Sequence, residues 1–484
     1  MNCDLGWKPD PRSAVPLFLQ IKEFIKGKIE SGEWPVGTQI PTQRALARSF
    51  EVNRSTVVAA LEELKADGLI QGKSGSGTRV VNHSWSLLSS SAPPDWNAYV
   101  RAGIHPPNLP AIQEINRAEF DPHVIRLGTG ELSPQLYPRE MMKQVMGSVS
   151  DRIHSLGYEE PKGLLPLREQ LSEYLRTIGI EASPSSILIV SGALQALQLI
   201  AFGLLQQGSS VFLERPSYLY SLNVFQSAGV RLFGVPMDES GMTTTVITEQ
   251  KKRRNAALLY TISSFHNPTG ITMSAERRQE LLRMCEQEQL PIIEDDVYRE
   301  LWLDEPPPPP LKALDKNGLV LYLGSISKTL SPGLRIGWVT GPESVIDRLA
   351  DIKMQTDYGS SSLSQWVATE WLASGKYFEH LDQIRRELRI RRDIALEALE
   401  DHLSGLAEWP IPKGGFYIWM RLFPSLSLRE LFEQALKEGI LINPGNVYDG
   451  NDSCHLRLSY SYASPGDLQN GIRRLSKLIQ KLSR

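Results

Sequence analysis

The chain has 484 residues, of which 41% are hydrophobic and 22% charged, and its formal net charge is −3. This composition is that of an ordinary globular protein with room for roughly two to four domains, and it excludes a globally basic nucleic-acid-binding chain. The three cysteines, Cys3, Cys285 and Cys454, lie far apart, which argues against a disulfide framework or a metal site and suits a reducing cytoplasm. The N-terminus has no apolar signal core, and we expect no membrane partner.

The first eighty residues have the pattern of three short helices and a hairpin. An apolar stripe at helical spacing follows Pro16, a short helix that Thr42 can cap comes next, and a third helix repeats apolar residues at 57, 60, 61 and 64. Residues 69–71 and 78–81 then flank a glycine-rich turn. This order predicts a winged helix-turn-helix domain over residues 12–82.

The third helix of this domain is the expected recognition helix, with its N-terminus in the major groove, while the second helix and the wing suit phosphate contacts. A protein–protein module with a charged face is the alternative, but the helix order and the wing favour DNA. Residues 41–44, 53–57 and 64–70 resemble the GntR type of bacterial repressor domain. The side chains that we expect to contact promoter DNA are Arg44, Arg54, Ser55, Thr56, Lys73 and Arg79.

Residues 83–118 break the helical pattern and are predicted to be a linker. The stretches 89–94 and 105–110 are rich in serine and proline, which favours turns and extended chain. A flexible linker of this length reaches on the order of 30 Å, so two DNA-binding heads could adopt different spacings.

After Phe120 the sequence predicts an α/β domain. Five apolar runs, ending near residues 190, 213, 262, 294 and 323, are each followed by a polar loop. In open parallel sheets ligands bind at the carboxyl ends of the strands. The five loops are therefore expected to meet at one site.

The chemistry that these loops share is that of pyridoxal 5'-phosphate. Lys328 can form a Schiff base with the aldehyde, and Asp295 can keep the pyridine nitrogen protonated. Asn267 and Tyr298 can bind the ring hydroxyl, and Tyr218 can stack on the ring. The residues expected at the phosphate are Gly192, Ala193, Ser325, Ser327 and Arg335. Each motif alone is an ordinary turn, cap or loop, but in this order they indicate the cofactor.

From about residue 125 to 482 the chain resembles fold-type I pyridoxal-phosphate enzymes of the aspartate aminotransferase superfamily, on residues 266–270, 295–298 and 325–337. The resemblance implies a large, mostly parallel sheet domain with a smaller α+β C-terminal subdomain, together spanning residues 119–484. It also implies that Tyr158 reaches the phosphate of the partner subunit and that Arg457 holds a carboxylate. Gly130 is expected to line the same pocket.

A GntR-like head before an aminotransferase-like body resembles the MocR/GabR family of bacterial transcription regulators. The resemblance implies a head-to-tail, domain-swapped homodimer that senses a small amine, an amino acid or the cofactor itself through Schiff-base chemistry at Lys328. The alternatives are a working aminotransferase that carries a DNA-binding domain, and a head that acts as a protein–protein adaptor.

Overall fold

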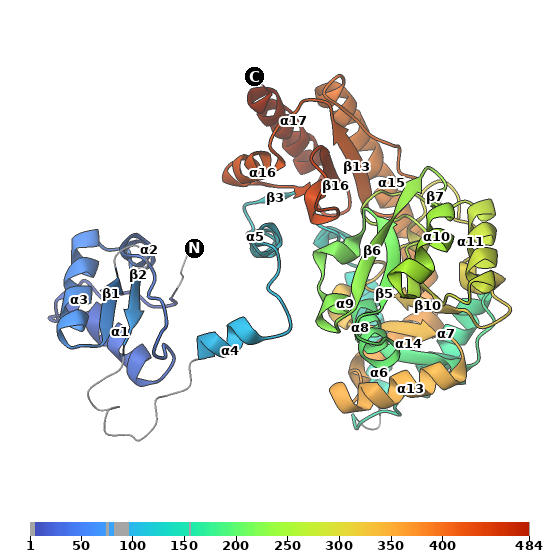
Figure 1. Cartoon of the computed structure of the whole chain (residues 1–484), viewed down its shortest axis with the longest axis horizontal. Helices are drawn as coiled ribbons and strands as arrows, with labels where there is room; N and C mark the ends of the chain where they lie inside the picture. The colour runs from blue at the N-terminus through green and yellow to red at the C-terminus, as the bar shows by residue number, and fades with distance from the viewer. Residues whose placement is uncertain (1–4, 74–76, 82–95, 154–155, 484) are drawn as a thin grey trace. The chain divides into compact units, whose positions relative to one another are not determined.

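The computed structural model describes residues 5–73, 77–81, 96–153 and 156–483. The chain divides into two compact units, Met1–Ile104 and His105–Arg484 (Figure 1). Each unit has its own hydrophobic core, so each can be understood from its own sequence.

The first unit is a three-helix domain with a two-stranded wing. Thr42 Oγ1 accepts the backbone N–H of Ala45 at 3.3 Å and caps the second helix, as predicted. The predicted apolar residues of the third helix, at 57, 60, 61 and 64, are all buried. The elements are α1 (Leu17–Glu30), α2 (Gln43–Ser49), α3 (Arg54–Ala66), β1 (Ile70–Lys73) and β2 (Gly77–Val80).

The N-terminal segment and the predicted linker differ from expectation. Trp7, upstream of the predicted domain start at residue 12, stacks on Phe24 with ring centroids 4.3 Å apart. Two helices, α4 (Trp96–Ala102) and α5 (Pro110–Ala118), lie within the range 83–118, so the predicted break in the helical pattern was wrong for these two stretches. Pro110 is the first residue of α5, a position where proline favours a helix because its missing N–H needs no partner. The stretch 89–94 lies outside the described residues.

The second unit is built on an eight-stranded sheet with the order β4-β11-β10-β9-β8-β5-β6-β7. The five central strands, from β10 to β6, run parallel, while β11 and β7 pair antiparallel at the two sides. The strands are β4 (Ile187–Val190), β5 (Ser210–Arg215), β6 (Arg231–Asp238), β7 (Gly241–Met242), β8 (Ala256–Thr261), β9 (Ile292–Asp295), β10 (Val320–Ser325) and β11 (Gly337–Thr340).

Both faces of this sheet are covered, and hydrophobic clusters lie on either side of it. Burial on both faces explains why the parallel strands read as continuous apolar runs. The helices of this part are α6 (Arg139–Arg152), α7 (Leu165–Thr177), α8 (Ala193–Leu204), α9 (Val224–Ser227), α10 (Thr245–Arg254), α11 (Ala275–Gln287), α12 (Leu311–Leu314), α13 (Glu343–Thr356) and α14 (Ser362–Ala373).

A smaller α+β subdomain follows, and the long helix α15 (Lys376–Leu403) leads into it. Its four-stranded antiparallel sheet has the order β12-β13-β16-β15, and α15 packs against the last helix. Ser464 Oγ caps that helix by accepting the N–H of Asp467 at 3.2 Å. The elements are β12 (Ala407–Glu408), β13 (Tyr417–Leu422), α16 (Leu428–Lys437), β14 (Ile440–Leu441), β15 (Asn443–Pro444), β16 (His455–Ser459) and α17 (Pro465–Leu482).

The segment that enters the body from the linker belongs to this subdomain. The strand β3 (Ile125–Arg126) pairs in parallel with β14, and Ile112, Ile115 and Ala118 of α5 are buried in the main core. The start of the body is therefore fixed to its C-terminal subdomain.

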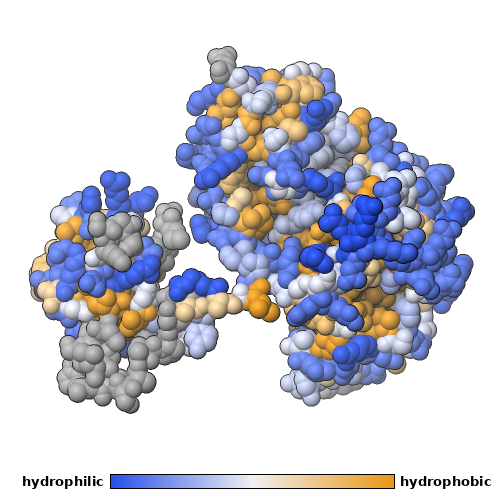
Figure 2. All heavy atoms as spheres, viewed as in Figure 1, coloured by the Kyte–Doolittle hydropathy of each residue, from blue (hydrophilic) through white to orange (hydrophobic). Residues whose placement is uncertain are grey.

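The viewed surface of the body is largely hydrophilic, with a strongly hydrophilic area over α10 (Figure 2). The last turn of α10 carries four basic residues, 251–254, which suit the negative end of the helix dipole. Within the described part of the chain, no helix combines the length and the apolar character that crossing a membrane requires.

Candidate functional site

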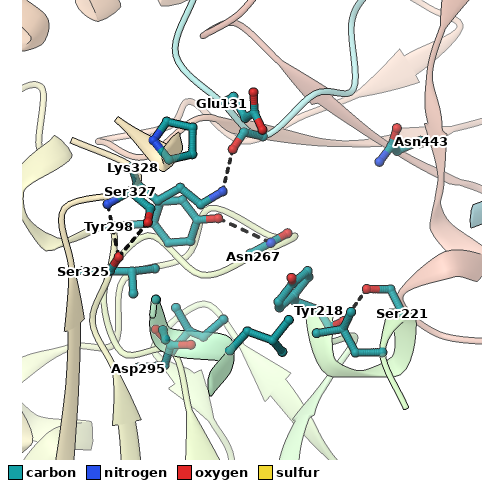
Figure 3. A pocket seen from close by; sticks show the side chains of 18 of the residues that line it. Glu131, Tyr218, Ser221, Asn267, Asp295, Tyr298, Ser325, Ser327, Lys328 and Asn443 are labelled. Carbon is teal, nitrogen blue, oxygen red and sulfur yellow. Dashed lines mark hydrogen bonds between the residues drawn. The ribbon is translucent and has the colours of Figure 1, made fainter. Parts of the chain in front are cut away.

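A pocket of about 410 Å³ opens in the body where the predicted loops meet. The loops after β5, β8, β9 and β10 line it together with the start of α8. Figure 3 shows Lys328, Tyr298, Asn267 and Tyr218 around the same cavity. Residues of α5 and of the small subdomain complete the wall, so the pocket lies between the two parts of the body.

Lys328 extends from the loop after β10 into this pocket. Its Nζ donates a hydrogen bond to the carbonyl oxygen of Gly130 at 2.7 Å. The side chain is half-buried. A primary amine that donates to a backbone carbonyl at the edge of a cavity is positioned to react with a carbonyl compound.

Asp295, the last residue of β9, lies at the floor of the pocket. Its Oδ2 accepts the hydroxyl of Tyr260 at 2.7 Å, while the buried Oδ1 has no hydrogen-bond partner among the described residues. Burial raises the pKa of Asp295 to about 6, against the hydrogen bonds from Tyr260 and the backbone of Val297, which lower it. The free oxygen is therefore an acceptor that needs a buried donor.

Asn267 and Tyr298, which the sequence predicted to bind the same ring hydroxyl, lie beside each other. Asn267 Nδ2 is 3.5 Å from the Tyr298 hydroxyl, which is 2.9 Å from the hydroxyl of Tyr417. The Tyr218 backbone N–H donates to the Asn267 carbonyl at 3.2 Å, and this bond joins the loops after β5 and β8. The three predicted side chains therefore share one wall of the pocket.

The residues predicted for the phosphate lie around the N-terminus of α8, but the backbone donors available there differ from the predicted pair. The N–H of Gly192 was predicted to bind the phosphate, but it donates to the Val190 carbonyl at 2.8 Å and is not free for an anion. The first-turn N–H groups of Ala193 and Leu194 remain, since the first amides of a helix have no intrahelical acceptor. The absence of a side chain at Gly192 instead leaves space for the Arg335 guanidinium, since an added Cβ would come within 2.7 Å of Arg335 Nη2.

Arg335 and the two serines flank the same helix end. Arg335 Nη2 donates to the Ser191 carbonyl at 2.6 Å, and the residue has a left-handed φ of 55°. Ser325 Oγ donates to the carbonyl oxygen of Ile336 and accepts the N–H of Ser327 at 3.1 Å. All three side chains line the pocket.

Arg457 is buried on β16 without an acidic partner within salt-bridge distance among the described residues. Its Nη1 donates to Asn267 Oδ1 at 2.8 Å and its Nη2 to the Gly128 carbonyl at 2.6 Å. The guanidinium lies 4.2 Å from the ring centroid of Tyr417 and 4.8 Å from that of Tyr448. A buried cation whose hydrogen-bond partners are neutral favours a bound anion, and the acid that acts on it, Glu119, does so at longer range from the pocket wall.

The structure adds residues that sequence reasoning missed, three in the pocket wall and one, Tyr260, behind it. Tyr417, Tyr448 and Asn443 surround Arg457, and Tyr260 holds Asp295. The amide of Asn443, turned to satisfy its neighbours, accepts from both Arg457 Nη2 and the Tyr448 hydroxyl at 2.9 Å. The glycine pair before Tyr417 and the apolar run after it could have predicted a turn and a strand. Nothing in the sequence, however, indicates that Tyr417 lies next to Arg457.

Tyr158, predicted to serve a partner subunit, lies away from the pocket. Its side chain is 83% exposed, and its ring contacts that of Tyr358 with centroids 4.9 Å apart. An exposed aromatic pair on a loop is consistent with a role outside its own subunit, which stays a prediction.

A buried acid–histidine pair lies behind the pocket loops. Glu214 Oε2 and His266 Nε2 are 3.9 Å apart, and neither has a hydrogen-bond partner among the described residues. Burial raises the pKa of Glu214 to about 7 and lowers that of His266 to about 3. His266 is therefore neutral near pH 7, whereas Glu214 is about half protonated at that pH.

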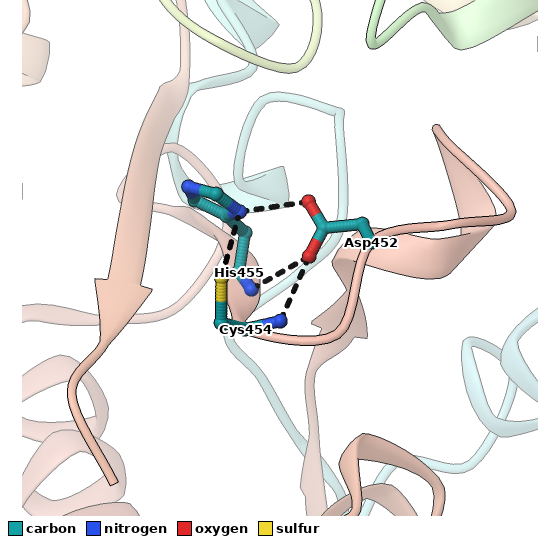
Figure 4. Close-up of side chains that lie close together, drawn as sticks. All are labelled: Asp452, Cys454 and His455. Carbon is teal, nitrogen blue, oxygen red and sulfur yellow. Dashed lines mark hydrogen bonds and ion pairs between the residues drawn. The ribbon is translucent and has the colours of Figure 1, made fainter. Parts of the chain in front are cut away.

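Asp452, Cys454 and His455 form a compact group at the start of β16 (Figure 4). Asp452 Oδ1 accepts the backbone N–H groups of Cys454 and His455, both at 2.9 Å, and Oδ2 lies 2.7 Å from His455 Nδ1. His455 also stacks on Trp419. These bonds close a turn and use the atoms that a metal would need, so we assign the group a structural role.

In the head, the side chains expected to contact DNA lie on one module. Arg44 and Arg54 are exposed, and Arg54 Nη2 donates to Gln43 Oε1 at 2.8 Å, which links α3 to α2. Ser55 and Thr56 occupy the first turn of α3, and Arg79 Nη1 donates to the Gly37 carbonyl at 2.9 Å. Lys73 ends β1, but its side chain lies outside the described part of the chain.

Comparison with known proteins agrees with both units. Residues 122–475 match the family "Aminotransferase class I and II", and residues 17–80 match the gntR family of bacterial regulatory proteins. The HTH-type transcriptional regulator YdfD of Bacillus subtilis, itself described as uncharacterized, is 58% identical over 97% of both chains. The regulator NorG of Staphylococcus aureus is 34% identical over 92% of this chain and 100% of its own.

Among solved structures, LysN, an α-aminoadipate aminotransferase from Thermus thermophilus, superposes with a TM-score of 0.73 and 31% identity. The match covers 80% of this chain and 99% of LysN. The aminotransferase structure matches the body, and the gntR family matches the head. The two regulator relatives align with nearly the whole chain. The chain therefore belongs to the MocR/GabR-type HTH transcriptional regulators, in which a GntR-family DNA-binding domain precedes an aminotransferase class I and II domain.

Proposed function

We propose that this regulator binds pyridoxal 5'-phosphate at Lys328 and changes its promoter binding when a small amine or amino acid enters the same pocket. The observation that carries the proposal is Lys328 in a cavity whose floor holds Asp295 Oδ1, an oxygen without a hydrogen-bond partner in the described part of the chain. A protonated pyridine nitrogen is the donor that this oxygen needs. The solved LysN structure, whose title names a phosphopyridoxyl-leucine ligand, supports the choice of cofactor.

When bound, the cofactor supplies an aldehyde that condenses reversibly with primary amines. Lys328 provides the resident amine, and Asp295 holds a proton at the ring nitrogen. The amides of Ala193 and Leu194, with Ser325, Ser327 and Arg335, bind the phosphate dianion. Asn267 and Tyr298 would hydrogen-bond the ring hydroxyl, and Tyr218 would stack on the ring.

Arg457 is a second point of attachment for the effector, whose amino group reacts at the Lys328 site. Because this guanidinium is buried and donates hydrogen bonds to two neutral oxygens, of Asn267 and Gly128, a carboxylate that reaches it gains a charge-assisted hydrogen bond in a buried site. An effector that carries both an amino group and a carboxylate therefore fits better than a simple amine. We expect Gly130, whose carbonyl faces Lys328, to line the space between the two anchors.

The effector acts through the relative position of the two parts of the body. Lys328 belongs to the large sheet, whereas Gly130 and Arg457 belong to the small subdomain, so a ligand that contacts both selects one degree of closure. Promoter affinity can change only by the difference in effector affinity between the closed and open arrangements.

We propose a head-to-tail homodimer. The exposed side chains of Leu156, Tyr158, Tyr358 and Leu363 support an interface, because a soluble protein rarely leaves such groups free together. In this dimer Tyr158 would reach the phosphate in the partner subunit.

The experiment is a spectroscopic titration of the purified full-length chain. Pyridoxal 5'-phosphate should produce a visible absorbance band in the wild type and none in Lys328→Ala. A panel of amines and amino acids is then added while promoter affinity is measured by fluorescence anisotropy. A wild type without the band would refute the proposal.

A working aminotransferase is the second candidate, because the pocket contains every predicted cofactor residue except Tyr158, which we assign to the pocket of the partner subunit. The chain is also 31% identical to the aminotransferase LysN. The regulator and the aminotransferase differ in whether the protein catalyses repeated transamination. Sustained conversion of amino donors and 2-oxo acids at ordinary enzyme rates, about 1 s⁻¹ or faster, would favour the enzyme.

A further inference from the structure

Three consecutive residues, Gly128, Thr129 and Gly130, touch both anchors of the proposed effector and the helix that leads to the linker. The Gly128 carbonyl accepts Arg457 Nη2 at 2.6 Å, and the Gly130 carbonyl accepts Lys328 Nζ at 2.7 Å. Between them, the Thr129 hydroxyl donates to Glu119 Oε1 at 3.0 Å. One short segment thus connects the carboxylate site, the amine site and the end of α5.

The packing of this segment leaves it little freedom to adjust locally. A Cβ added at Gly128 would come within 2.1 Å of the Asn443 side-chain amide, and one at Gly130 within 2.3 Å of the Tyr417 hydroxyl. Thr129 is only 2% exposed. A close-packed segment passes a displacement on to its neighbours instead of absorbing it.

Glu119 is the first residue after α5, and α5 itself forms part of the pocket wall. Ile112 and Ile115 line the pocket and are buried in the core of the body, and Asn116 and Glu119 line the pocket beside them. Upstream of α5 the chain continues through the linker to the DNA-binding head. A shift of α5 is therefore a shift of the point from which the linker leaves the body.

We propose that Thr129 and Glu119 are positioning residues that couple occupancy of the effector site to α5. The inference rests on the proposed function and names the route of its signal. With the cofactor bound, an effector amine would replace Lys328 on the aldehyde carbon: the effector nitrogen would bond to that carbon, the bond from that carbon to Nζ would break, and two protons would pass from the effector nitrogen to Nζ. Lys328 is thereby released as a primary amine whose nearest acceptor is the Gly130 carbonyl.

The carboxylate end acts on the same segment. A carboxylate at Arg457 competes with the Gly128 carbonyl for the guanidinium, so both ends of the effector change the hydrogen bonds of residues 128–130. The Thr129–Glu119 bond carries that change to α5.

The test uses aminooxyacetate, which carries a reactive nitrogen and a carboxylate and displaces a lysine from the cofactor whatever the natural effector is. The cofactor-loaded full-length chain is followed by absorbance and by hydrogen exchange of the peptide that covers α5. In the wild type we expect exchange of α5 amides to change by about fivefold, the scale of one hydrogen bond. In Thr129→Val the absorbance change should persist and the exchange change should fall below about twofold.

Matched variants separate coupling from stability. Thr129→Ser keeps the hydroxyl and should restore the wild-type response. Thr244→Val removes another Thr–Glu hydrogen bond, to Glu280 on the far side of the sheet, and should leave the response intact. A full α5 response in Thr129→Val, or none in a wild type whose absorbance changes, would overturn the coupling. If the wild-type absorbance does not change, the proposed function itself is wrong, and the coupling with it.

Discussion

Replacing Arg457 by methionine should remove the preference for carboxylate effectors without emptying the site. Methionine keeps an unbranched apolar side chain between the rings of Tyr417 and Tyr448 and deletes the buried charge. Because both Nη atoms already hold Asn267 and Gly128, an entering carboxylate gains about one charge-assisted hydrogen bond, or about 2–3 kcal/mol. That free energy corresponds to roughly 30- to 150-fold in Kd.

The assay compares two ligands that differ only at this group. L-alanine and isopropylamine share the amino carbon, and one carries a carboxylate where the other carries a methyl group. Titration of the cofactor absorbance should give a wild-type preference for alanine of roughly 30- to 150-fold and a preference near one in Arg457→Met. An unchanged preference in the variant would refute the assignment of Arg457. The folded state should change little, because loss of the costly buried charge offsets the three acceptors, on Asn267, Gly128 and Asn443, that lose the Arg457 donor.

Three further predictions test other parts of the molecule. Lys328→Ala should lose the visible absorbance of the bound cofactor, and an unchanged spectrum would exclude Lys328 as the anchor. Arg54→Ala should weaken promoter binding by about 1–3 kcal/mol and leave cofactor loading intact, whereas exposed Arg12→Ala in the same head should do neither. Glu214→Gln tests the buried acid: since its pKa is raised from 4.5 to about 7, the folded state binds more protons than the unfolded state across that window. Wild-type stability should therefore fall by about 3 kcal/mol as the pH rises from 4.5 to 7, and denaturant unfolding of the cofactor-free Gln variant should lack that decline.

Much of the pocket could be predicted because chain order and strand direction are enough to bring its loops together. The loops after β5, β8, β9 and β10 follow parallel strands, so their polar residues had to meet at one edge of the sheet. Alternation along β9 explains which of its acids faces the cavity. Asp295 lines the pocket, while the neighbouring Glu294 accepts the backbone N–H groups of Leu311 and Lys312 on the other side.

What could not be predicted depends on contacts between distant parts of the chain. Tyr417 and Arg457 meet because β13 and β16 pair in a register that no local pattern reveals. The error at α5 has a local cause, since Pro110 suggests extended chain although Ile112 and Ile115 follow at helical spacing. Proline at the first position of a helix and proline in a linker look alike until burial decides between them.

The position of α5 also bears on why a pocket equipped for catalysis can serve as a sensor. The residues at the proposed cofactor site do not distinguish an enzyme from a regulator, because both need the same amine, acid and anion cradle. A regulator also needs a contact that connects the pocket to the DNA-binding head and whose free energy differs between the empty and the occupied pocket. That difference in free energy limits the change in DNA affinity. The Thr129–Glu119 hydrogen bond alone supplies about 0.5–1.5 kcal/mol, which corresponds to roughly 2- to 13-fold in promoter affinity. A larger response would require both subunits of a dimer to change together, so the size of the measured response reports how many such links act.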